Sequence, residues 1–175
     1  MIEDFTITVR PANESELEML EKEFSPGYKS RHHFQRFEKQ KTGKGLYLIA
    51  WHNNVPVGHF LLEWDGPEDP TVATQIDIHK RAYLFALGTR EEYRRRGVAT
   101  RMIQTGERLA KEHGCEWIGV EVGKASNPDA RRLYEKLEYK DWDRGEFIVS
   151  SDYIIEDSQK YTEFEAVIYM DKKLL

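Results

Sequence analysis

The sequence predicts an α/β fold, one mixed β-sheet flanked by helices, in a single domain that spans residues 1–175. Three observations predict it: strand-like and helix-like segments alternate along the chain, one segment has the pattern of a β-hairpin, and one strand–helix–strand unit is typical of a parallel crossover. A chain of 175 residues can bury one compact core and is short for two.

The first third of the chain contains one strand, two helices and the hairpin. Alternating apolar residues predict a strand over 5–10, followed by a helix that ends at Phe24. A second helix is expected over about 28–41. Residues 45–64, "GLYLIAWHNNVPVGHFLLEW", predict two antiparallel strands that turn at His52–Val55.

The rest of the chain begins with a long loop, 65–81, which contains two prolines and several acidic residues. The elements expected after it are strand 82–88, helix 97–113, strand 117–122, helix 128–137 and strands near 139–149 and 164–170. Strand 82–88, the helix and strand 117–122 would form a right-handed parallel crossover. Because a hairpin precedes this crossover, the sheet should be mixed.

Charge and composition exclude several classes of protein. Lys and Arg number 26 against 31 Asp and Glu, a formal charge of −5, which argues against a nucleic-acid or anionic-membrane partner. The single cysteine cannot form an internal disulfide, the chain starts without a signal-peptide pattern, and no apolar run reaches the ~20 residues that span a bilayer. A cytoplasmic protein is therefore expected.

The stretch "YRRRGVATRM" (93–102) concentrates positive charge at the predicted start of helix 97–113. A helix N-terminus presents unpaired N–H groups and about half a positive charge, and the small Gly97 and Ala99 would let an anion approach the backbone. Arginine can add charge-assisted hydrogen bonds to a phosphate. A solvated surface run is the alternative. Neither G-x-G-x-x-G nor G-x-x-x-x-G-K-[ST] is present, so a dinucleotide or a nucleoside triphosphate is not expected.

Two motifs in this half of the chain resemble those of the GNAT N-acetyltransferase superfamily. "RRRGVA" is similar to its acyl-CoA pyrophosphate loop, [R/Q]-x-x-G-x-[G/A], and "NPDARRLYEKLEY" is similar to its second signature. The matching residues are Arg94, Gly97 and Ala99 in the first motif, and Asn127, Ala130, Leu133, Tyr134 and Leu137 in the second. Glu138 departs from the family, which commonly has Gly after this helix, and a left-handed turn there costs a non-Gly residue ~1–2 kcal/mol.

The resemblance implies a GNAT-like acyl-CoA N-acyltransferase fold with acetyl-CoA as co-substrate, lying in a V-shaped gap between two splayed parallel strands. N–H groups near Leu87 and Gly88 would polarise the thioester carbonyl, turned toward it by a bulge in strand 82–88. The implied cofactor-binding residues are Leu87, Gly88, Arg94, Arg95, Arg96, Gly97, Val98, Ala99, Thr100, Asn127 and Tyr134. For Asn127, capping of the following helix is an equally good explanation.

Acetyl transfer to an amine needs a base, because an alkylamine with a pKa near ~10.4 is mostly protonated at pH 7. Glu121 on strand 117–122 is the first candidate, and Glu63, Asp77 and His79 are further ones. Tyr134 matches the proton donor to the leaving thiolate in the family. A core tyrosine and an exposed carboxylate would show the same sequence pattern.

Neither a metal nor a cysteine intermediate is expected. The six histidines lack metal-ligand spacing, and His32 and His33 point in different directions on a helix. Cys115 follows a helix-ending glycine and precedes apolar residues, which favours a buried packing role over an acetyl-cysteine intermediate.

The expected function is transfer of an acetyl group from acetyl-CoA to a primary amine of a small molecule or peptide, by direct attack. Acidic residues of loop 65–81, namely Glu68, Asp69 and Asp77, would attract a cationic acceptor. The alternative is a non-catalytic acyl-CoA-binding sensor or regulatory module with the same fold, and a third interpretation is an RNA-binding patch on Arg94–Arg96, which the net charge argues against. Whether the chain forms a homodimer is left open.

Overall fold

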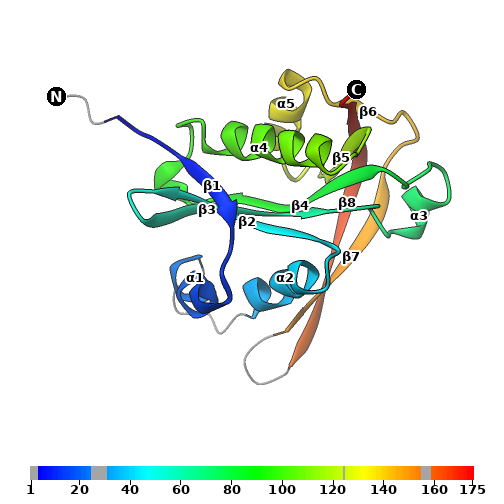
Figure 1. Ribbon diagram of the computed structural model, residues 1–175. Helices are drawn as coiled ribbons and strands as arrows, with labels where there is room; N and C mark the ends of the chain where they lie inside the picture. The colour runs from blue at the N-terminus through cyan, green and yellow to red at the C-terminus, as the bar shows by residue number, and fades with distance from the viewer. Residues whose placement is uncertain (1–3, 25–30, 124, 155–158) are drawn as a thin grey trace.

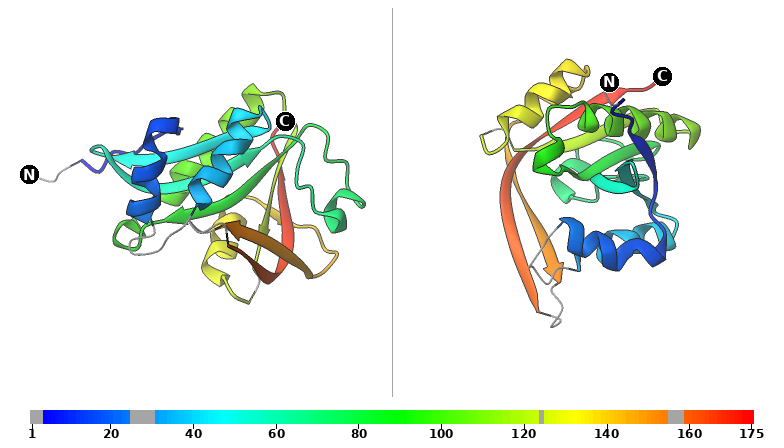
Figure 2. Two further views of the ribbon diagram at one scale, coloured as in Figure 1. Left: turned by 90° about the horizontal axis from the view of Figure 1, so that it is seen from below. Right: turned by 90° about the vertical axis from the view of Figure 1, so that its left-hand side faces the viewer.

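The computed structural model shows one twisted sheet with helices on both faces (Figure 1). It describes residues 4–24, 31–123, 125–154 and 159–175. Helices α4 and α5 cover one face of the sheet, and α1 and α2 cover the other, as the end-on view in Figure 2 also shows. Within the described residues, no helix is both long and apolar enough to cross a membrane.

The described residues form an eight-stranded mixed sheet in the order β1-β2-β3-β4-β5-β8-β6, with β7 paired to β8. The strands are β1 (Thr8–Pro11), β2 (Gly45–His52), β3 (Val55–Glu63), β4 (Arg81–Thr89), β5 (Trp117–Val122), β6 (Lys140–Asp141), β7 (Phe147–Ile154) and β8 (Lys160–Lys173). Strands β4 and β5 are parallel, whereas the other pairs are antiparallel. The mixed α/β class predicted from the sequence is therefore confirmed.

The helices bury apolar stripes against the two faces of the sheet. They are η1 (Glu14–Glu16), α1 (Leu17–Phe24), α2 (His32–Lys41), α3 (Pro70–Ala73), η2 (Glu91–Tyr93), α4 (Val98–Glu112) and α5 (Pro128–Lys136). On one face, Met102 and Ile103 of α4 are fully buried and belong to the same cluster as Phe60 of β3. On the other, Leu20 of α1 and Phe37 of α2 join a second cluster under β2 and β3. The sheet thus separates two hydrophobic cores.

The centre of the sheet opens where β4 and β5 part. Their pairing begins at Arg81↔Trp117 and ends at Leu84↔Val120, although both strands continue beyond that pair. Beyond Leu84, strand β4 also contains a bulge: Ala86 has a φ of 55°, and the β3–β4 register shifts beside it. The splayed strands and the bulge expected from the family resemblance are both present.

Several sequence-based boundaries differ from the structure. The strand expected near 139–149 is wrong in its limits: a turn with left-handed Asp143 and Gly145 divides it into β6 and β7, and β7 continues to Ile154. The sequence gives little sign of the length of β7, because half-buried and exposed residues alternate along it and polar side chains lie in its middle. Loop 65–81 contains helix α3, since Asp69 caps its start with a hydrogen bond to the Thr71 amide.

Other boundaries move by a few residues. The first strand occupies Thr8–Pro11 where 5–10 was expected, α2 begins at His32 where about 28 was expected, and β8 starts before the expected 164. Residues 28–30 of the expected second helix lie outside the described residues. Glu138 takes a left-handed conformation, with φ 73°, and the Tyr139 amide donates 2.9 Å to the Tyr134 carbonyl. The turn after α5 is therefore the left-handed one for which glycine is the usual residue.

Candidate active site

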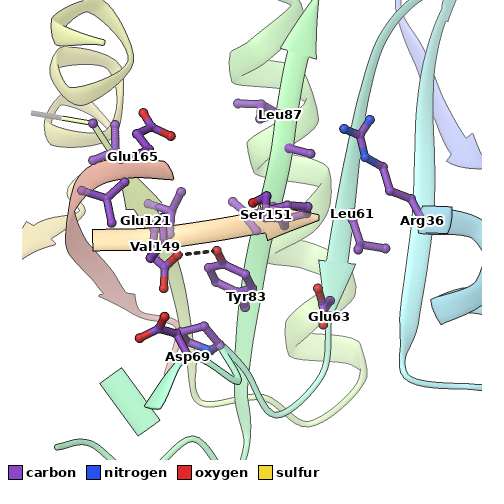
Figure 3. A pocket seen from close by; sticks show the side chains of 18 of the residues that line it. Arg36, Leu61, Glu63, Asp69, Tyr83, Leu87, Glu121, Val149, Ser151 and Glu165 are labelled. Atoms are coloured by element: carbon purple, nitrogen blue, oxygen red, sulfur yellow. Dashed lines mark hydrogen bonds between the residues drawn. The ribbon is translucent and has the colours of Figure 1, made fainter. Parts of the chain in front are cut away.

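The gap between β4 and β5 opens into a cavity of about 1080 Å³ (Figure 3). Its walls come from residues that follow the last β4–β5 pair, including Phe85 and Leu87 on one side and Glu121 on the other. Parts of α2, α5, the segment before α3 and the β7–β8 hairpin complete the lining. Backbone groups that would pair in a regular parallel sheet therefore border an open space.

A second, smaller hollow of about 190 Å³ lies at the start of α4. Gly97 is the residue before the helix and has a φ of 84°, a left-handed conformation that glycine adopts without strain. No side chain caps the helix at this end. The hollow is lined by Thr89, Tyr93, Arg94, Arg95, Gly97, Val98, Ala99, Thr100 and Leu133. Uncapped amides and two arginines make this hollow suited to an anion.

The three arginines of the loop point in different directions. Arg94 and Arg95 line the hollow, and Nε of Arg94 donates 3.2 Å to the Thr89 carbonyl, which ties the loop to the end of β4. Arg96 instead stacks its guanidinium on the Phe5 ring, 3.7 Å from the ring centroid, and is not among the lining residues of either hollow. The structure thus brings together the loop residues predicted to bind cofactor, except Arg96.

The carboxylate of Glu121 lines the large cavity and has a raised pKa. Its Oε2 accepts a 3.0 Å hydrogen bond from the Tyr83 hydroxyl, while its Oε1 is buried and has no hydrogen-bond partner among the described residues. Burial raises the pKa of Glu121 to about 7; the Tyr83 hydrogen bond opposes this shift, and the negative charges of Asp69 and Glu165 add to it. Near neutral pH this carboxylate can both accept and release a proton.

Further carboxylates lie around Glu121 on the cavity wall. Burial raises the pKa of Glu63, which forms an ion pair with Lys39 at 3.3 Å. Asp69 lies near Glu121 in Figure 3, and Glu165 accepts a hydrogen bond from Ser126. This part of the cavity is therefore strongly acidic.

Tyr134 lines the same cavity from α5 and is only 3% exposed. Its ring contacts Tyr139 edge-on, with centroids 5.3 Å apart. Burial raises the pKa of the Tyr134 phenol, so the group is protonated at neutral pH. Within the described residues its hydroxyl makes no hydrogen bond, which leaves its proton available for a bound molecule.

Comparison with known proteins decides the family. The model of the Acetyltransferase (GNAT) family matches residues 13–139. The chain belongs to this GNAT family. Both motifs that resembled the superfamily lie inside the matched region, and the small hollow at α4 and the gap between β4 and β5 occupy the two places that the resemblance implied.

Relatives and solved structures agree with the GNAT assignment. An N-alpha-acetyltransferase of Saccharolobus solfataricus is 29% identical over 97 residues, which are 54% of this chain and 56% of that protein, so the chain spans little more than half the length of this curated relative. The ribosomal-protein-S18-alanine N-acetyltransferase from Escherichia coli has a TM-score of 0.64 at 16% identity, covering 97% of this chain and 94% of that one. An acetyltransferase from Salmonella typhimurium, solved with its cofactor acetyl-CoA, has a TM-score of 0.64 at 10% identity, covering 97% and 95%. These structures share the GNAT fold.

The other candidate residues of this GNAT domain divide into those at the cavity and those elsewhere. Asn127 lines the cavity and also caps α5, because its Oδ1 accepts 3.2 Å from the Ala130 amide. Asp77 and His79 are not among the lining residues, so the structure does not bring them to the cavity. Cys115 is buried among core residues, and burial raises the pKa of its thiol. In the described parts of the chain, no group of three or more His, Cys, Asp or Glu is arranged to hold a metal.

Gly88, which the resemblance implied as a cofactor-binding residue, packs tightly against a histidine and is not among the cavity-lining residues. A Cβ at position 88 would lie 2.8 Å from Cε1 and Nε2 of His59, so a side chain there would displace the ring. His59 lines the cavity, burial lowers its pKa well below the usual value, and its Nδ1 is buried without a partner among the described residues. Leu87, next to the bulge, lines the cavity directly.

Three parts of this GNAT cavity have no recognisable signal in the sequence. Tyr83 lies in an apolar strand and gave no signal of its contact with Glu121. Arg36 and the β7 residues reach the cavity only through tertiary packing, because α2 and the β7–β8 hairpin lie far from β4 and β5 in sequence. Alternation of strand residues could have predicted which side of β7 faces inward, but not what it faces.

Proposed function

We propose that the chain transfers an acetyl group from acetyl-CoA to a primary amine of a small molecule or peptide, by direct attack of the amine. The observation that carries this proposal is the shared cavity of Glu121 and Tyr134, a carboxylate with a pKa of about 7 and a protonated phenol, at the open end of the β4–β5 pair. The names of the relatives, which are N-acetyltransferases, support the same class of reaction.

The residues fit acetyl-CoA in two places. The hollow at α4 offers free helix amides and the guanidinium groups of Arg94 and Arg95 to a diphosphate. The stretch of β4 from Phe85 to Gly88 has no partner on its β5 side, so it can pair with the amides of the pantetheine arm as a strand pairs with an edge. When bound, acetyl-CoA supplies an acetyl group activated as a thioester.

Glu121 acts as the general base in this proposal. An acceptor amine with a pKa near ~10.4 must lose a proton before it can attack, at a cost of roughly 4–5 kcal/mol at pH 7 in water. A carboxylate whose pKa is about 7 matches the operating pH better than an exposed glutamate does. Its buried Oε1 is the atom available to take that proton, because Oε2 is held by Tyr83.

Tyr134 acts as the general acid. Its phenol stays protonated in the buried site and can donate to the departing sulfur. A free thiol has a pKa near ~8.5, so the leaving group needs less help than the nucleophile does. We expect Tyr134 to contribute less to the rate than removal of the amine proton.

The bulge in β4 supplies the third component. The left-handed Ala86 turns the strand locally, so that the amides of Leu87 and Gly88 need not follow the regular ladder. We propose that these amides donate to the carbonyl oxygen on which negative charge develops. A cytoplasmic location stays a prediction, and the oligomeric state stays open.

The experiment is a thermal-shift titration with acetyl-CoA, CoA and longer acyl-CoAs, followed by assay of CoA thiol release with a panel of primary amines. Saturation at a hundred times the dissociation constant should stabilise the fold by about 2.7 kcal/mol. Release of thiol only in the presence of an amine supports the proposal. Binding without release for every amine would identify a sensor, and steeply salt-dependent RNA binding without acetyl-CoA binding would identify the third alternative.

A further inference from the structure

We propose that the acceptor is a dipolar amine, one that carries a carboxylate or phosphate in addition to its amino group, and that Arg36 binds this anionic group. This inference rests on the proposed function and assigns a role to a further residue of the same cavity. Its basis is that the cavity has two walls of opposite charge, one acidic and one formed around a single arginine.

The acidic wall surrounds Glu121. Glu63, Asp69 and Glu165 line the cavity with it, and the charges of all three raise its pKa. Among the described residues, Lys39 forms an ion pair with Glu63, whereas Glu121, Asp69 and Glu165 have no ion-pair partner. A cationic amine would be attracted to this wall and would arrive beside the proposed base.

The opposite wall contains Arg36, a residue of α2. Figure 3 shows Glu121 and Asp69 on one side of β4 and Arg36 on the other. Arg36 lines the cavity and is half-buried, yet no carboxylate among the described residues forms an ion pair with it. Lys39, one turn further along the same helix, contacts both Glu63 and Glu68. Of these two cations on α2, only Arg36 is left to bind an anion from outside.

The histidine and tyrosine side chains around Arg36 are neutral, and the nearby buried carboxylate of Glu21 accepts a hydrogen bond from the His33 amide. Burial and the positive charge of Arg36 lower the pKa of His32 to about 4 and that of His33 to about 3. The same two causes lower the pKa of His59. Burial raises the pKa of Tyr47, whose hydroxyl lies beside Arg36 and contacts Nδ1 of His33.

A partly desolvated guanidinium without an ion-pair partner is destabilising unless a ligand supplies the counter-charge. Its planar fork matches a carboxylate or a phosphate, to which it can donate two parallel hydrogen bonds.

The diphosphate of acetyl-CoA does not account for Arg36. The hollow suited to the diphosphate lies at the start of α4, and α4 and α2 cover opposite faces of the sheet. The pantetheine arm, which follows β4, carries no charge. The remaining phosphate of CoA is on its ribose, at the adenosine end beyond the diphosphate. The proposal therefore assigns the anion that meets Arg36 to the other substrate, whose amine meets the acidic wall.

The test compares amines that differ only in an anionic group, using the full chain. One pair is 4-aminobutyrate and butylamine, and the other is 2-aminoethyl phosphate and ethanolamine, which separates carboxylate from phosphate as the source of the charge. We expect kcat/KM to be at least about tenfold higher for the anionic member of one pair, as a charge-assisted contact predicts. In Arg36→Gln this advantage should disappear through a fall in kcat/KM for the anionic amine, while acetyl-CoA affinity is kept.

Arg31→Gln is the matched control. Arg31 precedes α2, stacks on Phe34 and pairs with Glu18 outside the cavity, so its loss should leave the preference intact. Equal rates for both members of each pair, a preference for the neutral amines, or an advantage that survives in Arg36→Gln would overturn the proposal. If acetyl-CoA binds but no amine is turned over, calorimetry of the anionic amines with CoA-bound wild type and Arg36→Gln measures the same difference. Absence of binding there also overturns it, whereas loss of acetyl-CoA binding itself would count against the proposed function.

Discussion

The Tyr83 hydroxyl donates a 3.0 Å hydrogen bond to Oε2 of Glu121, and the two residues lie on either side of the last β4–β5 pair, Leu84↔Val120. Tyr83 belongs to β4, and Glu121 to β5. The bond favours the charged carboxylate, whereas burial and neighbouring acids favour the protonated one. The pKa of about 7 is the outcome of these opposing effects.

Replacing Tyr83 by Phe should move the pH dependence of the reaction. Loss of a hydrogen bond worth about 1 kcal/mol to the ionised form raises the pKa of Glu121 by somewhat less than one unit. Because Glu121 must be deprotonated to act as a base, kcat/KM of the wild type should rise with pH through about 7, and this limb should shift upward in Tyr83→Phe. An unchanged limb, or one shifted downward, would contradict the assignment of Glu121 as the base.

Replacing Glu121 by Gln should lower turnover by roughly 10²-fold to 10⁴-fold and change the pH dependence of stability. The pKa of Glu121 is raised from 4.5 to about 7, so the native state binds the proton more tightly than the unfolded state. The wild type therefore loses up to roughly 3 kcal/mol of stability as pH rises from below 4.5 to above 7, and Glu121→Gln lacks this loss. Urea denaturation at pH 5 and pH 8 measures it. The exposed Glu112→Gln should retain the wild-type dependence.

Gly97→Glu should lower acetyl-CoA affinity by at least about a hundredfold, through bulk and like charge at the proposed diphosphate site. Gly43→Glu is a matched control, because Gly43 also has a left-handed φ, 74° against 84°, and a Cβ at either position would meet no protein atom within 4 Å. Both variants carry similar backbone strain, but Gly43 lies far from the hollow in sequence and does not line it. Isothermal titration with acetyl-CoA separates the two, and equal affinities would show that the hollow does not bind the diphosphate.

Tyr134→Phe should lower turnover by roughly tenfold to a thousandfold while acetyl-CoA affinity is kept. Tyr139 provides the comparison, since its ring contacts Tyr134 and its hydroxyl donates 3.1 Å to Glu107, away from the cavity lining. Tyr139→Phe should cost about 1 kcal/mol of stability through the lost hydrogen bond and leave turnover near the wild-type value. Steady-state kinetics and denaturation of the two variants check both statements. Unchanged turnover in Tyr134→Phe would make this residue part of the core only.

Local patterns were enough to predict the mixed sheet and the glycine turn before α4. Gly97 signals its left-handed conformation through its identity, and the apolar spacing after it predicts α4, because both depend on neighbours in sequence. β7 was harder to delimit, since a half-exposed hairpin lacks an apolar run. Glu138 shows the opposite case: a side chain occupies a left-handed position that its residue type does not favour, held by the hydrogen bond that ends α5.

The electrostatics of the site could not be read from the sequence. Glu121 resembles any strand glutamate until Tyr83, Asp69 and Glu165, which come from three other parts of the chain, surround it. Arg36 likewise becomes distinctive only because the histidines around it are uncharged and Lys39 forms ion pairs with Glu63 and Glu68. Such properties arise from tertiary contacts, and a single sequence contains no direct signal for them.

The pairing of β4 with β5 ends before either strand does, so the sheet is incomplete at its centre. Four residue pairs join β4 to β5, and beyond Leu84 the β4 groups on that side are not paired with β5, which is where the proposed pantetheine arm would pair. A variant in which β4 and β5 formed hydrogen bonds to the ends of both strands would be more rigid. It would also close the cavity in which the proposed reaction takes place. The sheet therefore forgoes the stability of further hydrogen bonds between β4 and β5, and in the proposed function the gap left there holds acetyl-CoA.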